Sequence, residues 1–231
     1  VTLWFADTLW EDEDLYRFLE DLEARWEKKI VRHAEGRNPL QIAEDRKLIP
    51  NSWAAPCSHL LKQVPFREFL ETIEKPVTVH LGLDWSEGHR HAKPKEIYES
   101  IEGVSVDFPL TWEPLPYMDY TNMIEKWGID PPRLYALGFP HNNCGGRCVR
   151  QGMKEWLRLK QFFPERFTQV RDWELEQRAK GGARANRSIL KDRKGGTAKP
   201  LTLEKLEQDN SDTQIDMFAT QGDSYGCFCE Y

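Results

Sequence analysis

Five cysteines are the residues of this sequence best suited to chemistry. Cys57 stands alone, whereas Cys144 and Cys148 form one close pair and Cys227 and Cys229 form another. So few thiols, so unevenly placed, do not make the disulfide framework of a secreted protein. Close pairs in a reducing compartment indicate metal binding or redox chemistry instead.

Three arrangements of these thiols are open. The first is a cluster on Cys57, Cys144 and Cys148 with one open position, such as a 4Fe-4S cluster. The second is a closed site for Zn or an iron–sulfur cluster on the two close pairs, which include Cys227 and Cys229. The third is a redox tail in which Cys229 attacks a bound substrate. We rank the metal arrangements above the redox tail, and Cys57 and Cys148 taken singly are equally well explained as small buried hydrophobic residues.

The loop that carries the middle pair favours reactive thiols. It reads HNNCGGRC over residues 141–148 and precedes an expected helix. Its glycines let the backbone bend around an ion. The helix dipole and Arg147 both favour the thiolate form of the cysteines there.

Asp7 and Thr8 follow the first apolar run directly. In open parallel sheets, ligands bind beyond the carboxyl ends of the strands, where these side chains can hydrogen-bond a ribose or a base. The alternative is that Asp7 caps the helix that follows.

A second polar loop, Gly82–His91, also follows an expected strand. It combines acids, a hydroxyl, imidazoles and a guanidinium. Such a composition suits a phosphate or sulfate site in which an acid such as Glu87 holds Arg90 in place. The alternative is a solvated loop.

Apolar periodicity predicts the elements that position these loops. Strands alternate with amphipathic helices, which is typical of a doubly wound, mostly parallel α/β sheet. C-terminal helices follow, one of them capped by Asp119 and closed by Gly128. We expect strands over residues 1–6, 30–33, 77–83 and 104–110, and helices over residues 11–30, 66–73, 95–101, 149–163 and 165–178.

Length and composition fit one domain with a tail. A chain of 231 residues with 39% hydrophobic side chains can bury one full core. We place an α/β domain at residues 1–178 and a basic flexible segment with a cysteine-containing tail at residues 179–231. No apolar run reaches the roughly 20 residues of a membrane span, and no signal peptide is recognisable, so we expect a cytoplasmic protein.

Charge is unevenly distributed. The formal net charge is -6, which argues against a generally nucleic-acid-binding surface. Residues 178–199 nevertheless hold eight Lys or Arg and a single acid, Asp192. This segment is a candidate for steering tRNA or another polyanion, with a solvated linker as the more ordinary interpretation.

The order of these motifs resembles the phosphoadenosine phosphosulfate (PAPS) reductase family, within the PP-loop, adenine nucleotide alpha-hydrolase-like superfamily. The resemblance covers about residues 1 to 160, and the combined order is more specific than any single motif. Its residues are Trp4-Phe5-Ala6-Asp7-Thr8 with Glu11 and Tyr16-Arg17-Phe18; Pro56-Cys57 with Leu61-Lys62 and Pro65; Gly82 through Glu87 with Arg90; Phe108-Pro109-Leu110 with Trp112, Tyr120 and Thr121; and Gly128-Ile129, Pro132, Leu134-Tyr135, Gly138-Phe139 and Cys144.

This resemblance implies a Rossmann-like, HUP-type fold that binds ATP or PAPS at the strand ends. Family members either reduce the sulfonucleotide or adenylate a substrate before sulfur transfer, and several carry iron–sulfur clusters. It further implies that Asp7, Thr8 and Arg90 line the nucleotide site, with Gly82 and Glu87 in the same loop. The thiols of Cys57 and the Cys144/Cys148 pair are expected near that site.

Two features of the family pattern have no counterpart here. The Ser-Gly-Gly phosphate loop after the family's first strand would lie upstream of Val1, so we expect that strand and loop to be missing from this sequence. The reductases' terminal Glu-Cys-Gly-Leu-His motif is replaced by Cys227-Phe228-Cys229. We expect a PP-loop nucleotide-dependent enzyme, inactive without its phosphate loop, and as the alternative a non-catalytic zinc-stapled module that binds a nucleotide or a protein.

Overall fold

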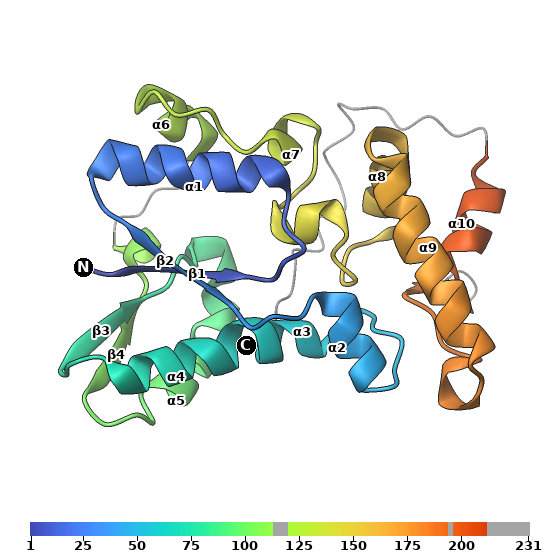
Figure 1. The fold of residues 1–231 in the computed structure, drawn as a ribbon, viewed down its shortest axis with the longest axis horizontal. Helices are drawn as coiled ribbons and strands as arrows, with labels where there is room; N and C mark the ends of the chain where they lie inside the picture. The colour runs from blue at the N-terminus through green and yellow to red at the C-terminus, as the bar shows by residue number, and fades with distance from the viewer. Residues whose placement is uncertain (113–119, 194–195, 212–231) are drawn as a thin grey trace.

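The structure is a computed structural model that describes residues 1–112, 120–193 and 196–211. It is a mixed α/β structure in which the strands and their helices occupy one side and a group of C-terminal helices the other (Figure 1). Within these residues no helix combines the length and the apolar character needed to cross a membrane.

The chain opens with a parallel strand pair. Strands β1 (Leu3–Asp7) and β2 (Ile30–Ala34) are connected by helix α1 (Glu13–Trp26). Asp12 caps this helix, because its side chain accepts a hydrogen bond from the backbone N–H of Asp14. The expected strand–helix–strand order is confirmed, and the alternative that Asp7 caps the helix is wrong.

A second parallel pair follows the same plan. Strands β3 (Val77–His80) and β4 (Val104–Asp107) are connected by helix α5 (Ala92–Tyr98), and helix α4 (Val64–Thr72) precedes them. Their shared core contains Leu70, Val79 and Val106. The expected alternation is confirmed here too, although both strands are shorter than expected.

Helix α4 packs against both strand pairs. The ring centroid of Trp4, on β1, lies 4.9 Å from that of Phe66 and 6.3 Å from that of Phe69, both on this helix. Phe66 in turn makes an edge-to-face contact with Tyr98 of α5. In Figure 1, α1 and α4 lie on opposite sides of β1 and β2.

The single doubly wound sheet that the sequence predicts is not observed among the described residues. They form two separate two-stranded parallel sheets and one antiparallel pair, β5 (Leu190–Asp192) with β6 (Lys199–Leu201). The alternation of elements depends on local periodicity, whereas the joining of strand pairs depends on long-range backbone hydrogen bonds that this pattern does not specify.

Two helical segments between β2 and α4 were not predicted. Helix α2 (Pro39–Asp45) starts at a capping box formed by Asn38 and Gln41. Helix α3 (Pro56–Ser58) runs through a π-helical turn (His59–Gln63) into α4. The sequence indicated a helix only from residue 66, because Pro65 obscures the earlier turns.

The C-terminal helices pack around a larger core. It contains Trp156, Leu159, Phe167 and Val170, and it extends to Cys144. These helices are α7 (Arg133–Ala136), α8 (Met153–Phe162), α9 (Pro164–Ala179) and α10 (Leu203–Asp209), whereas α6 (Tyr120–Lys126) lies beside α1 in Figure 1. The helices expected over residues 149–163 and 165–178 are confirmed; Asp119, the expected cap of α6, lies outside the described residues.

The segment after α9 is not the flexible linker that its composition indicates, as far as the structure describes it. Ile189 and Leu190 of the β5 region and Leu203 of α10 are buried in the larger core. Glu174 of α9 is fully buried, and its carboxylate accepts the backbone N–H groups of Ile189 and Leu203, each at 2.7 Å. Three buried apolar side chains and one buried carboxylate therefore hold this otherwise polar segment against the core.

Candidate functional site

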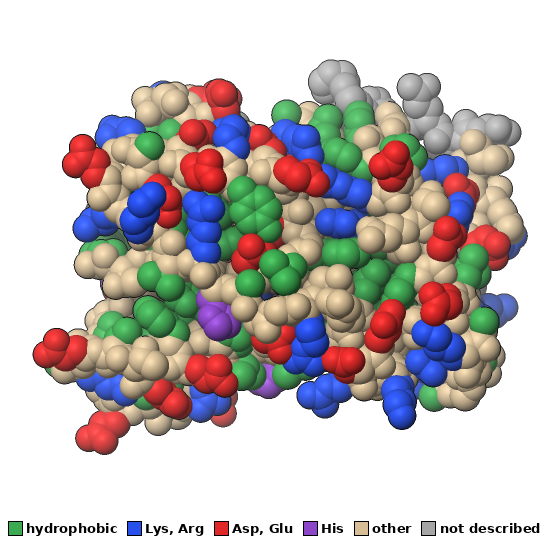
Figure 2. Space-filling view, viewed as in Figure 1, with side chains coloured by type: hydrophobic (Ala, Val, Ile, Leu, Met, Phe, Trp, Pro, Cys, Tyr) green, Lys and Arg blue, Asp and Glu red, His purple; other side chains and the backbone are tan. Residues whose placement is uncertain are grey.

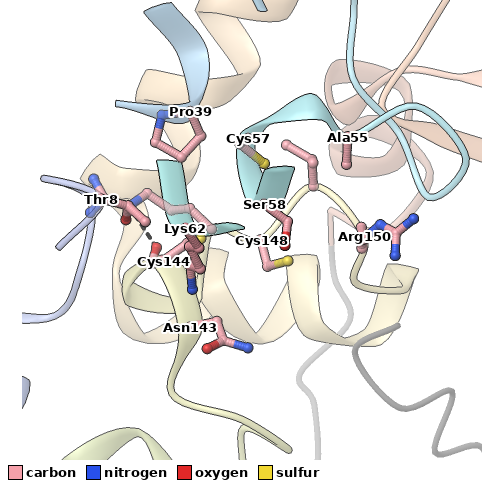
Figure 3. A pocket seen from close by; sticks show the side chains of 12 residues that line it. Thr8, Pro39, Ala55, Cys57, Ser58, Lys62, Asn143, Cys144, Cys148 and Arg150 are labelled. Carbon is pink, nitrogen blue, oxygen red and sulfur yellow. Dashed lines mark hydrogen bonds between the residues drawn. The ribbon is translucent and has the colours of Figure 1, made fainter. Parts of the chain in front are cut away.

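A pocket lies where the carboxyl end of β1 meets α3 and the loop before α8 (Figure 3). Its wall comes from four parts of the chain that are far apart in sequence. The lining residues are Thr8, Pro39, Ala55, Cys57, Ser58, Lys62, Asn143, Cys144, Arg147, Cys148, Val149 and Arg150.

Three of the five candidate thiols line this pocket. Cys144 and Cys148 are buried, Cys57 is half-buried, and all three are free thiols. Within the described ranges, no group of three or more His, Cys, Asp or Glu side chains is placed to hold a metal ion. Cys227 and Cys229 lie outside the described residues, so the closed four-thiol site stays a prediction.

Burial raises the pKa of the Cys57 thiol to about 11. The nearby Cys144 adds to this rise, and the ammonium group of Lys62 opposes it. At neutral pH Cys57 is therefore a protonated thiol and a poor nucleophile.

Cys144 has an unusual backbone conformation for a residue with a side chain. Its φ is 54°, in the left-handed region, and Gly145 follows at 56°. Glu11 stabilises this turn: one carboxylate oxygen accepts the N–H of Cys144 at 2.8 Å, and the other accepts the hydroxyl of Thr8 at 2.7 Å. A single buried carboxylate thus joins the end of β1 to the thiol loop.

Arg147 holds the same loop from its other end. Its guanidinium lies 3.9 Å from the ring centroid of Trp10 and donates to the carbonyl of that residue at 2.9 Å. Burial lowers the pKa of Arg147 to about 10, and the nearby Arg166 contributes. Arg147 therefore serves both as a pocket wall and as a clamp between the two loops.

A charge network behind the pocket fixes the start of α1. Asp12 is fully buried and forms ion pairs with Arg133 at 2.8 Å and with Arg166 at 2.7 Å. Although burial opposes it, hydrogen bonds from these arginines hold the pKa of Asp12 below its usual range. Arg166 also donates to the carbonyl of Gly145 at 3.0 Å, so the network supports the thiol loop directly.

Asp7 does not line the pocket, although Thr8 beside it does. One oxygen of Asp7 accepts the backbone N–H of Leu9 at 2.8 Å and the hydroxyl of Tyr16 at 2.9 Å. Burial and the adjacent Asp7 raise the pKa of Tyr16. The role of Asp7 in this structure is to shape the turn after β1.

Gly82, Glu87 and Arg90 are not among the residues that line the pocket. Glu87 and Arg90 form an ion pair with each other inside the short helical turn Trp85–Arg90 at the end of β3. The expected pairing of acid and arginine is present, and of the implied nucleotide trio Asp7, Thr8 and Arg90, only Thr8 reaches this pocket.

The pocket also contains functional groups that the sequence analysis did not single out. These are Arg150 and Ser58, which line it, whereas Glu11, which was named only as part of the family resemblance and given no role, positions the pocket from behind. Glu11 carries a recognisable signal, since it follows the Asp-Thr strand end by three residues, but nothing in the sequence shows its contact with Cys144. Arg150 lies just beyond the thiol pair and shortly before α8. Its position in the sequence therefore does not show whether it belongs to the pocket or only to the start of that helix.

The lining is electrostatically one-sided. Lys62, Arg147 and Arg150 contribute three cationic groups, and no Asp or Glu is among the lining residues. The surface that the lining residues expose in the pocket is nevertheless mostly apolar, and the guanidinium of Arg147 is engaged with Trp10. No family model, curated protein or solved structure matches the chain.

Proposed function

We propose that this protein is a nucleotide-dependent enzyme of the PAPS-reductase-like, PP-loop type, and that the Thr8–Cys144 pocket is its substrate site. The reaction class is either reduction of a sulfonucleotide such as PAPS or ATP-dependent adenylation followed by sulfur transfer. In this proposal the strand pairs belong to a doubly wound, Rossmann-like arrangement of the HUP type.

One observation carries the proposal. Thr8 at a strand end, Lys62 on a helix and the Cys144/Cys148 loop converge on one pocket although they are far apart in the sequence. Binding at the carboxyl ends of parallel strands is the general rule for α/β nucleotide enzymes. A strand-end hydroxyl, cations and thiols in one pocket are what an anionic nucleotide and sulfur chemistry together require.

The proposal assigns roles to residues that line the pocket. Lys62 and Arg150 bind the phosphate or sulfate groups, and the Thr8 hydroxyl, whose hydrogen is donated to Glu11, accepts a hydrogen bond from the nucleotide. Cys144 or Cys148 supplies the reacting thiol, because the raised pKa of Cys57 keeps that thiol protonated. The described thiols do not by themselves form a group that fits a metal ion, so no step of the proposal uses one.

Nucleotide binding tests this directly. We expect ATP or PAPS to raise the thermal unfolding midpoint of the full chain. Lys62→Ala and Arg150→Ala should each weaken the measured affinity by about tenfold or more, since a charge-assisted hydrogen bond is lost. The matched controls are Lys28→Ala and Arg25→Ala, which remove exposed cations on or after α1.

The products separate the two reactions. Formation of pyrophosphate from ATP indicates adenylation, whereas release of sulfite together with adenosine 3′,5′-bisphosphate from PAPS, with oxidation of two thiols to a disulfide, indicates sulfonucleotide reduction. Absence of any thermal shift with both nucleotides, or equal affinities for Lys62→Ala and Lys28→Ala, would overturn the proposed site.

A further inference from the structure

Trp53 is a large aromatic side chain held out in water. It is 77% exposed, the highest exposure among the described tryptophans. The turn that carries it is fixed, because the buried side chain of Asn51 accepts the backbone N–H groups of Trp53 at 2.9 Å and Ala54 at 3.1 Å. The ring is therefore presented to solvent on a support that side-chain hydrogen bonds fix.

A basic hairpin faces this ring. The ammonium group of Lys191, on β5, lies 5.9 Å from the centroid of Trp53. In the β5–β6 register, Leu190 opposite Leu201 points inward, whereas Lys191 lies opposite Pro200. Arg193, two positions after Lys191, is exposed, whereas Lys199 lies opposite Asp192 on the other face of the strand pair.

The hairpin is positioned as firmly as the turn. Glu174 binds the backbone at Ile189, directly before β5, and at Leu203, directly after β6. The hydroxyl of Ser188 accepts the N–H of Leu201 at 3.0 Å and so holds the two strands together. The Trp53 indole and the Lys191 ammonium group are thus brought together by the Trp53 turn and the β5–β6 strand pair, each held by hydrogen bonds.

This combination is local. Figure 2 shows acidic and basic side chains interspersed over the face in view, with no broad basic area. The Trp53 turn leads directly into the pocket wall, since Ala55 lines the pocket together with Arg150. An elongated anionic ligand on the hairpin would therefore approach the pocket entrance along Trp53.

We propose that Trp53, Lys191 and Arg193, here called the Trp53 surface, bind single-stranded nucleic acid beside the pocket. A base stacks on the indole, and the lysine and arginine groups contact the phosphates. A rigid exposed aromatic ring next to cations fits an unpaired base better than a duplex, whose bases are already stacked. The inference goes beyond the proposed nucleotide chemistry and does not depend on it.

Fluorescence anisotropy with a labelled oligonucleotide of about 12 nucleotides tests the proposal at low salt. Trp53→Ala should weaken binding by about tenfold or more, and Trp53→Tyr should restore most of the loss because a tyrosine ring still stacks. Lys191→Ala should lower the slope of log affinity against log salt by about 0.7. Trp85→Ala, which removes another exposed indole, and Lys28→Ala are the matched controls.

Three results would overturn the proposal. The first is an affinity of Trp53→Ala for the oligonucleotide equal to that of Trp85→Ala. The second is that a duplex of the same sequence binds as tightly as the single strand. The third is that polyglutamate of matched charge competes as well as the unlabelled oligonucleotide, which would indicate a general polyanion surface or an acidic protein partner. The ATP and PAPS thermal shifts of Trp53→Ala should match those of the unaltered protein. A failure of the Trp53 surface is therefore distinguishable from a failure of the pocket.

Discussion

The carboxylate of Glu11 and the backbone N–H of Cys144 are hydrogen-bonded at 2.8 Å, although 133 positions separate them in the sequence. Because the second oxygen of Glu11 accepts the Thr8 hydroxyl, one side chain sets the distance between the strand end and the thiol loop. The arrangement of the pocket depends on this buried carboxylate.

Removing the Glu11 carboxylate should destabilise the fold. Glu11→Ala leaves the buried N–H of Cys144 and the hydroxyl of Thr8 without acceptors, so we expect the free energy of unfolding to fall by about 2 to 4 kcal/mol. Glu11→Gln should cost less, because its amide oxygen still accepts from Cys144 and its amide N–H₂ donates to Thr8. Urea unfolding measures both changes. Glu20→Ala, at a side chain 68% exposed, is the control, and equal losses for the two Glu11 variants would contradict this role.

Alkylation of Cys57 should be slow at neutral pH and should accelerate with pH. Its pKa of about 11 predicts a rise of about tenfold for each pH unit below that value, because only the thiolate reacts. Lys62→Ala removes the cation that lowers this pKa, so labelling should be slower at any given pH, whereas Lys28→Ala should have no effect. Peptide mass spectrometry after iodoacetamide treatment resolves Cys57 from Cys144 and Cys148. A rate that levels off near the ordinary thiol pKa would contradict the assignment.

Glu174 should make stability depend on pH in a defined direction. Burial raises the pKa of this carboxyl above its ordinary value of 4.5, so the folded protein binds the proton more tightly than the unfolded chain. Its favourable contribution is complete below pH 4.5 and is lost as pH rises through the folded pKa. The free energy of unfolding of the protein minus that of Glu174→Gln should therefore decrease as pH rises above 4.5 in chemical denaturation. A difference that grows with pH would contradict the direction of this shift.

Gly146 should not tolerate a methyl group. A Cβ atom there would lie 3.0 Å from Cε1 of Phe139 and 3.2 Å from Cδ1 of Leu159. Gly128, with a similar positive φ, has no atom within 4 Å of the same position. Gly146→Ala should therefore lower the free energy of unfolding by about 1 to 3 kcal/mol more than Gly128→Ala does. Thermal or urea unfolding compares the two, and equal losses would show that backbone strain alone limits both positions.

The amino-acid sequence by itself determined the alternation of the four strands of the parallel pairs with α1, α4 and α5, and the two long helices α8 and α9. Periodicity along α1, α5, α8 and α9 is a local property, so it is visible without any tertiary contact. Spacing and residue type also identified Thr8, Cys57 and the Cys144/Cys148 loop as candidates, and these residues do line one pocket.

Only the tertiary structure decided which candidates meet. Glu11 and Arg147 join the thiol loop to the end of β1, whereas Arg90 pairs with Glu87 and stays outside the pocket. Likewise Glu174 holds the two ends of a polar, basic segment against α9 through the backbone N–H groups of Ile189 and Leu203. Each of these outcomes depends on a hydrogen bond, an ion pair or packing of side chains that come together only in the folded chain, and local sequence patterns carry no record of such partners.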